Sequence, residues 1–151
     1  MSAHTLTAGT ATARRPRSPM TSFYAGAAID LVLGLELMLF GGWFAALMLP
    51  DTPQILGLST ALLLRLAGGV LLLFAVDTFI VARSQGRLAR FRPAVMAANW
   101  VGAALCLGLA LLAAPVLSTV GVTLLVGLAL IGAVVAMTQK RALRVAALAS
   151  R

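Results

Sequence analysis

Four ionisable side chains lie inside long apolar runs of the chain, where a charge is unfavourable. They are Asp30, Glu36, Arg65 and Asp77. An Asp, Lys or Arg at the centre of a membrane helix costs about 2.5–3.5 kcal/mol on insertion scales. Such groups usually face the inside of a helix bundle, where they pair with one another or line a path for protons or ions. These residues therefore indicate a proton or cation site, and the alternative is that they are polar clamps between helices.

The depth of these polar groups follows from the rise of a helix. At about 1.5 Å per residue, Asp30, Asp77 and Asn99 lie about 10, 8 and 9 Å in from the same side of three different helices. If all three face inward, they form one polar cluster. Glu36 lies deeper, at about 18 Å, and Arg65 lies about 13 Å in from the opposite side. A pair between Glu36 and Arg65 is expected, because a charge within a bundle needs a partner.

The residues needed for other chemistry are missing from the sequence. The only histidine is His4, in a polar segment, and the only cysteine is Cys106, in an apolar run. Haem, zinc and thiol-exchange sites need more of these residues, and no nucleophile has a histidine nearby. The sequence also has no glycine loop of the phosphate-binding kind. We therefore expect no catalytic, cofactor-binding or metal-binding residue, no cofactor and no enzyme activity.

The elements that position these residues are indicated by composition. Hydrophobic residues make up 61% and charged residues 11% of the chain, against roughly 45–50% and 25% in soluble domains. A soluble fold of this size would expose large apolar patches. The net charge of +8 falls in short clusters between apolar runs, which excludes a nucleic-acid interface and favours attraction to anionic lipid headgroups. The sequence thus predicts an integral membrane protein with the lipid bilayer as its first partner.

The apolar runs predict an all-α four-helix bundle that occupies residues 23–138. The predicted helices cover about 23–49, 56–82, 93–114 and 116–138, and about 20 residues suffice to cross a hydrocarbon core. Residues 1–22 are expected to be a disordered basic cytoplasmic tail, and residues 139–151 a second basic cytoplasmic tail. For the second tail, a short basic helix on the lipid surface is equally open.

Orientation follows from the positions of the basic residues. They lie before the first helix, between the second and third, and after the fourth: Arg14, Arg15, Arg17, Arg83, Arg87, Arg90, Arg92, Lys140, Arg141, Arg144 and Arg151. The loops around residues 50–55 and 114–118 have no Lys or Arg. By the positive-inside rule, both termini are cytoplasmic. The bias toward Ala, Leu, Gly and Arg favours a bacterial inner (plasma) membrane, and Arg14-Arg15 is a poor export signal because the following apolar run is too long.

Glycines occur in every predicted helix. Small residues let helix backbones approach closely, so tight helix packing is the favoured interpretation and a substrate groove the alternative.

The run Leu63-Leu64-Arg65-Leu66-Ala67-Gly68-Gly69, followed by an apolar stretch and a basic loop, resembles a pattern in small bacterial membrane proteins. These are the DoxX-like and related uncharacterised four-helix families. Pro50 at the end of the first helix is similar too, and the resemblance covers residues 30 to 110. Some DoxX-like members are linked to quinone or sulfur redox chemistry. The cysteine pairs and histidines for that chemistry are missing here, so the resemblance implies the architecture and no functional residue.

The sequence is compatible with two functions. The first is a non-enzymatic membrane interaction or structural module, which binds a second copy of itself or another membrane protein. The second is a small proton- or cation-coupled transporter or channel subunit that uses the intramembrane carboxylates. A cavity that reaches Glu36 would favour the second function, whereas a tightly packed interior around Glu36 would favour the first.

Overall fold

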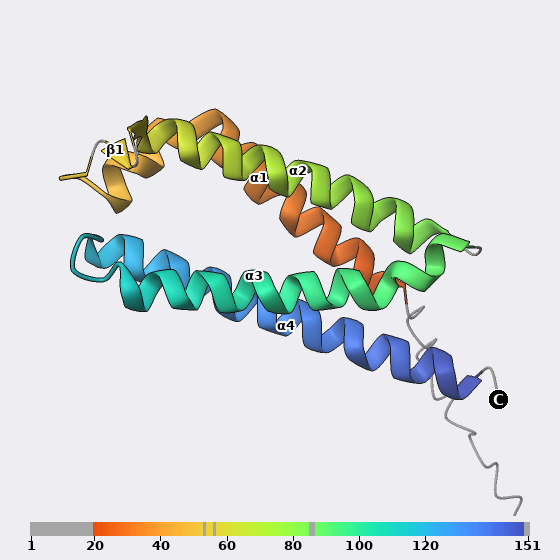
Figure 1. Ribbon diagram of the computed structural model, residues 1–151. Helices are drawn as coiled ribbons and strands as arrows, with labels where there is room; N and C mark the ends of the chain where they lie inside the picture. Colours follow the sequence, from red (N-terminus) through yellow and green to blue (C-terminus); the bar gives the residue numbers. More distant parts are fainter. Residues whose placement is uncertain (1–19, 53, 56, 85–86, 150–151) are drawn as a thin grey trace, which may run out of the picture.

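The computed structural model describes residues 20–52, 54–55, 57–84 and 87–149 (Figure 1). The described elements are α1 (Thr21–Met48), β1 (Gln54–Ile55), β2 (Leu58–Ser59), α2 (Thr60–Arg83), the 3-10 helix η1 (Arg87–Phe91), α3 (Arg92–Leu112) and α4 (Thr119–Ala149). Each of the four α-helical segments is long and apolar enough to cross a membrane. The prediction of an all-α fold with four such helices is therefore confirmed for the described residues, with one small antiparallel hairpin added.

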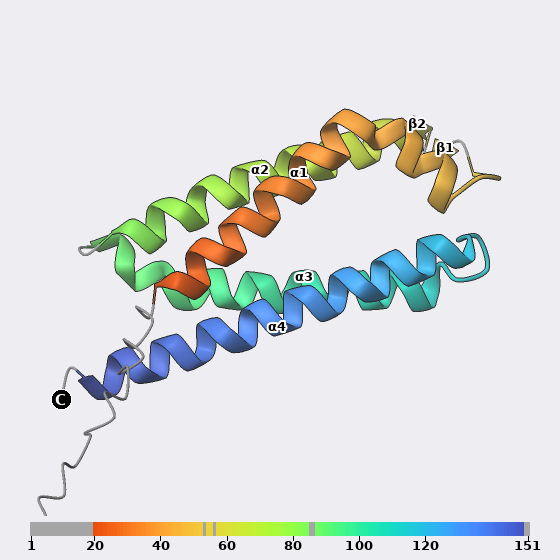
Figure 2. The same cartoon turned by 180° about the vertical axis from the view of Figure 1, so that it is seen from behind.

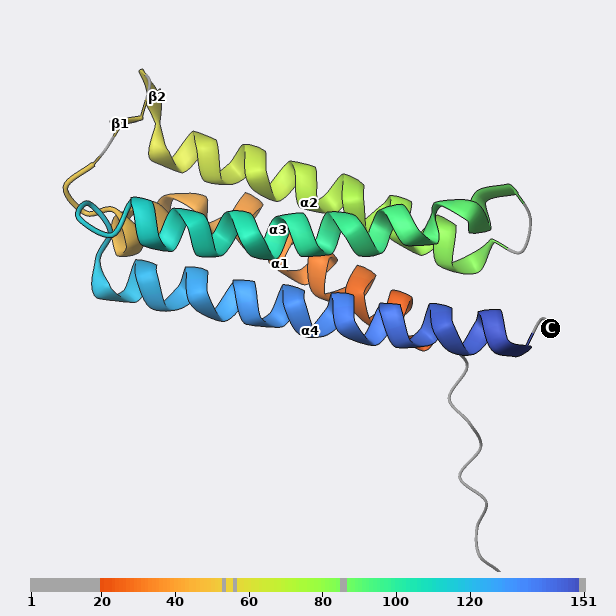
Figure 3. The ribbon, with the colours of Figure 1, turned by 60° about the horizontal axis from the view of Figure 1, so that its bottom comes forward.

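The helices form two helical hairpins, α1 with α2 and α3 with α4. In Figures 1 and 2, the start of α1 lies beside α3 and α4 at one end, the two hairpins separate in the middle, and the end of α1 approaches α4 again at the other end. We call the first of these two ends the basic end: it holds the start of α1, the end of α2, η1 and the start of α3. The opposite end, with β1 and β2, is the strand end. Figure 3 shows from another direction that all four helices run lengthwise between these two ends.

The hydrophobic core lies at the basic end, where all four helices meet. Phe23 of α1 is fully buried against Val81 and Ala82 of α2 and Val95 of α3. Leu143 of α4 packs against the same cluster. This core explains why the two hairpins converge there.

The seam between α1 and α2 depends on two glycines that face each other. A Cβ at Gly34 would lie 2.9 Å from the carbonyl oxygen of Gly68, and a Cβ at Gly68 would lie 2.7 Å from the carbonyl oxygen of Gly34. Neither position can hold a larger residue without a backbone shift, so the two helices are in backbone contact. The prediction of close packing at glycines is confirmed at this seam.

α1 bends after it leaves this seam. Phe40 has non-helical backbone angles (φ −110°, ψ 17°) and directly precedes Gly41-Gly42, and sharp helix bends commonly occur near glycine. α1 therefore touches α4 twice: Gly26 lies against Val135 near the basic end, and Met48 lies against Gly121 at the strand end. Between these two contacts α1 bows toward α2.

Ser118 links the end of α1 to the start of α4 at the strand end of the bundle. Its Oγ donates to the carbonyl oxygen of Leu47 (2.6 Å), and its backbone N–H donates to that of Met48 (2.8 Å). The last carbonyls of a helix lack partners inside it, so Ser118 satisfies two of them on α1. The Ser118 Oγ also accepts from the Gly121 N–H (3.0 Å) and so caps the start of α4.

Helix boundaries differ from the prediction at the start of α2 and at both ends of α4, which begins at Thr119 rather than at 116. α2 begins at Thr60 rather than near 56, because the chain first forms the β1–β2 hairpin, with Gly57 at φ +79°. Ser59 then caps α2 by accepting from the Leu62 N–H (3.2 Å). α1 and α3 end within two residues of the predicted positions, at Met48 and Leu112.

The difference at the end of α4 concerns the chain beyond residue 138. α4 continues to Ala149, so residues 139–149 belong to a long helix and not to a separate tail. No Pro or Gly interrupts this stretch, and most of its residues favour helix. At about 1.5 Å per residue, the 31 residues of α4 extend about 46 Å, more than the roughly 30 Å of a hydrocarbon core. The predicted disordered tail 1–22 lies outside the described residues except for Met20, Thr21 and Ser22, the last two of which begin α1.

Candidate functional site: a cavity between the two helical hairpins

A cavity of about 480 Å³ lies where α1 bows away from α4, and all four helices line it. Its wall near the basic end includes Asp30 of α1 and Asn99 of α3. Its wall near the strand end is apolar and includes Phe44 and Met48 of α1. The bend of α1 and its contacts with α4 at both ends thus produce an internal space with a polar and an apolar end.

Asp30 is the carboxylate at the polar end. It is half-buried, and its Oδ2 is covered from solvent without a hydrogen-bond partner among the described residues. A buried carboxylate oxygen without a donor is unfavourable. One carboxylate oxygen of a residue that lines the cavity is therefore covered and lacks a donor.

Asn99 lies beside the cavity in a fixed position. Its Nδ2 donates to the Oε1 of Gln139 on α4 (3.0 Å). Asn99 is 9% exposed and Gln139 fully buried, and the Nε2 of Gln139 lies 3.1 Å from the position that a Cβ at Gly26 would occupy. The absence of a side chain at Gly26 thus makes room for Gln139, and Gln139 holds Asn99 on the cavity wall.

Glu36 also lines the cavity, but its side chain is exposed. The predicted pair with Arg65 is wrong: no ion pair joins them, although both residues lie in the described part of the chain. The Arg65 Cγ instead lies 2.8 Å from where a Cβ at Gly41 would be. Glu36 and Gly41 are five residues apart, which separates them by about 140° around α1 at about 100° per residue. Arg65 therefore packs on a different face of α1 from the one that carries Glu36.

Asp77 does not join the polar cluster that its depth predicted. It is exposed on α2 and is not among the residues that line the cavity. The inward position at this level of α2 is the next residue, Thr78, which is fully buried. The structure thus brings Asp30 and Asn99 to one cavity and leaves Asp77 outside it.

Two buried polar residues were missed by the sequence reasoning. Gln139 was excluded because the fourth helix was predicted to end at Thr138. The signal was present: Gly132, Val135 and Gln139 are spaced as neighbours on one helical face, and Gly132 and Val135 both line the cavity. Thr78, whose Oγ1 has no partner within the described part of the chain, carries no signal in the sequence, because an isolated threonine in an apolar run does not reveal which way it faces.

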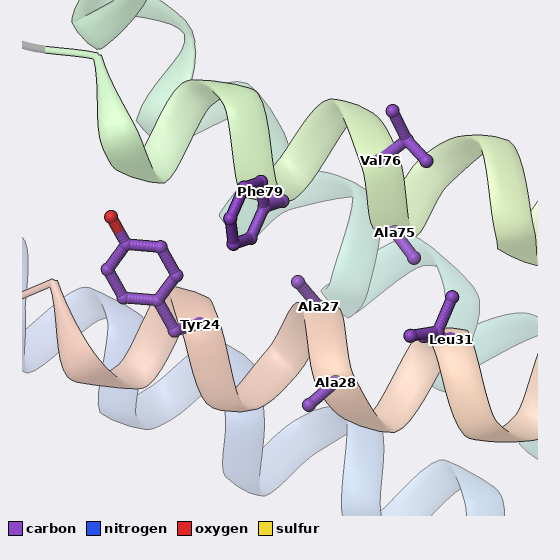
Figure 4. A pocket seen from close by; sticks show the side chains of 7 residues that line it. All are labelled: Tyr24, Ala27, Ala28, Leu31, Ala75, Val76 and Phe79. Atoms are coloured by element: carbon purple, nitrogen blue, oxygen red, sulfur yellow. The ribbon is translucent and has the colours of Figure 1, made fainter.

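A second, smaller hollow lies between α1 and α2 near the basic end and has a different character. It measures about 330 Å³ and is lined by Tyr24, Ala27, Ala28, Leu31, Ala75, Val76 and Phe79 (Figure 4). The rings of Tyr24 and Phe79 meet edge to face, with centroids 5.6 Å apart and planes at 64°. Its lining contains no Asp, Glu, Lys or Arg, so this hollow has no charged side chain that could bind an ion.

The chemistry available in the larger cavity is the binding of a positive charge or a proton. Asp30 and Glu36 supply carboxylates, and no Lys or Arg is among the residues that line the cavity. Within the described residues, no group of three or more His, Cys, Asp or Glu could hold a metal ion. Cys106 lines the same cavity as a free thiol.

Comparison with known proteins identified no relative of this chain. No family model, no curated protein and no solved structure matches it. The resemblance of residues 63–69 to DoxX-like proteins therefore stays a prediction from the sequence.

Proposed function

We propose that this chain is a multi-pass protein of the bacterial inner membrane, with both termini in the cytoplasm, and that it works as a small proton- or cation-coupled transporter or channel subunit. The observation that carries the proposal is the cavity, which all four helices line and which contains Asp30 and Glu36. Intramembrane carboxylates that face a cavity are typical of ion and proton pathways.

Insertion in a bilayer is supported by the surface of the bundle. Large apolar side chains are exposed along all four helices, with Leu39 on α1, Leu73 on α2, Leu111 on α3 and Leu130 on α4 each more than 60% exposed. In water such a surface would aggregate, whereas hydrocarbon solvates it.

The orientation is supported by the basic end. Exposed Arg83, Arg90, Lys140, Arg141 and Arg144 belong to the end of α2, to η1 and to the extension of α4. Lys and Arg are enriched on the cytoplasmic side of membrane proteins. The same residues would contact anionic lipid headgroups, at about 1 kcal/mol per basic residue near the surface.

The cavity favours transport over a purely structural role. If the intramembrane carboxylates only clamped helices, Asp30 would be expected to bond to a neighbouring helix. Its Oδ2 instead has no partner within the described residues, and the residue itself lines the cavity. A carboxylate in this position can take up and release a proton or a cation in turn, which is the step that transport requires.

The test is a flux measurement in liposomes that contain the purified protein and an internal pH-sensitive dye. A potassium diffusion potential drives proton entry, and the same vesicles are then assayed with a sodium gradient. We expect flux above that of empty liposomes, a loss of at least tenfold in Asp30→Asn, and a reduction in Glu36→Gln. Asp77→Asn makes the same chemical change outside the cavity and is expected to keep the wild-type rate.

Flux that is no higher than in empty liposomes with both ions would overturn the proposal. So would equal losses in Asp30→Asn and Asp77→Asn, because the cavity would then have no special role.

A membrane interaction module is the second candidate, and one observation favours it. Arg65 and Asp77 are exposed on α2, and neither forms an ion pair with any described residue. Charged groups within a membrane usually pair, so another protein or a second copy would supply the partners. Chemical crosslinking in native membranes tests this: a crosslinked species that disappears in the Arg65→Gln, Asp77→Asn double variant supports the module, and an unchanged pattern opposes it.

A further inference from the structure

From the lining of the cavity, we infer that its ligand is a lipophilic organic cation, a molecule with a protonated amine and an apolar body, held by Asp30 and Asn99. This inference deepens the proposed transport function and rests on it for the consequence that the bound cation is transported. The binding step itself is argued from the cavity alone.

The charge of the cavity selects a cation. Asp30 and Glu36 are the charged residues among its lining, and both are acidic. The Oδ2 of Asp30 is covered and has no donor among the described residues. When the Asp30 carboxylate turns toward the cavity, an ammonium N–H would supply that missing donor, and charge-assisted hydrogen bonds are roughly twice as strong as neutral ones. The same carboxylates repel fatty acids and other organic anions.

The remaining wall selects an organic ligand over a bare metal ion. A hard cation such as Ca²⁺ needs six to eight oxygen ligands in close range, whereas most of this wall consists of leucine, valine, alanine and phenylalanine side chains. Phe74, which also packs against the core at the basic end, is part of it, and aromatic faces attract organic cations. Phe44 belongs to the apolar end. An apolar body with one charged end thus matches the two ends of the cavity.

The size of the cavity agrees with this class of ligand. Its volume of about 480 Å³ falls within the roughly 300–1,000 Å³ that is common for small-molecule sites. Asn99 donates its amide N–H to Gln139 (3.0 Å), and its side-chain carbonyl oxygen can accept a hydrogen bond from an ammonium group.

The ligand can enter from the side. α2 and α3 are linked by η1 at the basic end, and the lining residues Val70 of α2 and Val101 and Leu105 of α3 are all about 60% exposed. The cavity therefore opens between these two helices toward the surface that the bilayer would cover. A lipophilic cation concentrates in the bilayer and would reach Asp30 without crossing the basic end.

The test uses two probes with the same apolar body, adamantane-1-methylammonium and the neutral adamantane-1-methanol. Binding of each is measured by isothermal titration to the full chain in lipid nanodiscs, with empty nanodiscs subtracted. We expect the ammonium probe to bind at least tenfold more tightly than the alcohol. Asp30→Asn should weaken binding of the ammonium probe at least tenfold and leave the alcohol unchanged, whereas the matched variant Asp77→Asn should change neither.

A second pair of variants tests the location by filling space. Gly102 lines the cavity, Gly108 on the same helix does not, and a Cβ at either position meets no atom within 4 Å. Gly102→Leu should weaken binding of both probes, and Gly108→Leu should weaken neither. Equal binding of the two probes to the wild-type protein, or equal effects of Asp30→Asn and Asp77→Asn, would overturn the inference.

The outcomes separate this inference from the proposed function. Asp30-dependent proton or sodium flux without preferential binding of the ammonium probe would refute the lipophilic cation and preserve transport. Asp30-dependent binding of the ammonium probe in a protein without flux would refute transport and preserve the binding site.

Discussion

Two interfaces of this bundle are built from similar residues and have opposite properties. The seam between α1 and α2 brings Gly34 and Gly68 into backbone contact, with no space for even a methyl group. The interface between the two helical hairpins contains Gly102, where a side chain would meet no atom within 4 Å, and leaves a cavity of about 480 Å³. A glycine in a membrane helix thus indicates close packing only when the facing helix also approaches.

The largest effect should come from disturbing the seam. Gly68→Ala places a Cβ 2.7 Å from the carbonyl oxygen of Gly34, and overpacking of this kind costs about 1–3 kcal/mol. The expected result is a lower free energy of unfolding in an SDS titration. The adjacent Gly69→Ala is the control, since its Cβ would lie 3.8 Å from the Met38 Sδ, an ordinary contact. Equal stability of the two variants would refute the backbone contact between α1 and α2 at Gly34 and Gly68.

The second prediction concerns Ser118, which links the end of α1 to the start of α4 at the strand end. Ser118→Ala removes the hydrogen bond to the Leu47 carbonyl oxygen and the cap of α4. Loss of such a cap costs about 0.5–2 kcal/mol, and we expect a lower melting temperature in detergent. Thr123→Val removes an exposed hydroxyl that bonds only within α4 and should melt like the wild type. If the Ser118→Ala protein is as stable as the wild type, the Ser118 hydrogen bonds do not stabilise the bundle.

A smaller effect is expected for the polar contact between α3 and α4. A double-mutant cycle with Asn99→Ala and Gln139→Ala should give a coupling free energy of about 0.6 kcal/mol, the average for hydrogen bonds between membrane helices. Unfolding in SDS measures each corner of the cycle. Additive effects of the two substitutions would mean that the 3.0 Å bond contributes nothing to stability.

The smallest change in stability is expected for a substitution at Gly102, which faces open space and not another helix backbone. Gly102→Ala adds a methyl group inside the open space of the cavity and should change the free energy of unfolding by no more than about 0.5 kcal/mol. The measurement is the same SDS titration used for Gly68→Ala. A loss comparable to that of Gly68→Ala would show that the hairpins pack tightly at this point.

The sequence correctly predicted the features that depend on the hydrophobicity of a single segment. Long apolar runs interrupted by Pro50, Pro93 and Pro115 predicted four helices, because a helix is the local structure that satisfies its own backbone hydrogen bonds in an apolar medium. The predicted end of the fourth helix was wrong, because the charged residues after Thr138 were interpreted as the end of a helix. Charge ends a membrane span, but it does not end a helix, so Lys140 and the residues after it continue α4.

The candidate site was predicted in part. Asp30, Glu36 and Asn99 were identified by their residue type and depth, and all three line the cavity. Depth alone could not tell that Asp77 faces outward or that Arg65 packs on Gly41 rather than beside Glu36. These outcomes depend on the rotation of each helix about its axis, which is set by contacts with its neighbours.

The sequence by itself determined the helical class, the approximate spans and the small set of ionisable groups within them. These properties are local, since hydrophobicity and backbone hydrogen bonding act along a single segment. The tertiary structure alone decided the bow of α1, the cavity beneath it and the partner of Asn99. Each of these depends on contacts between residues far apart in the chain, as between Gly34 and Gly68 or between Met48 and Gly121.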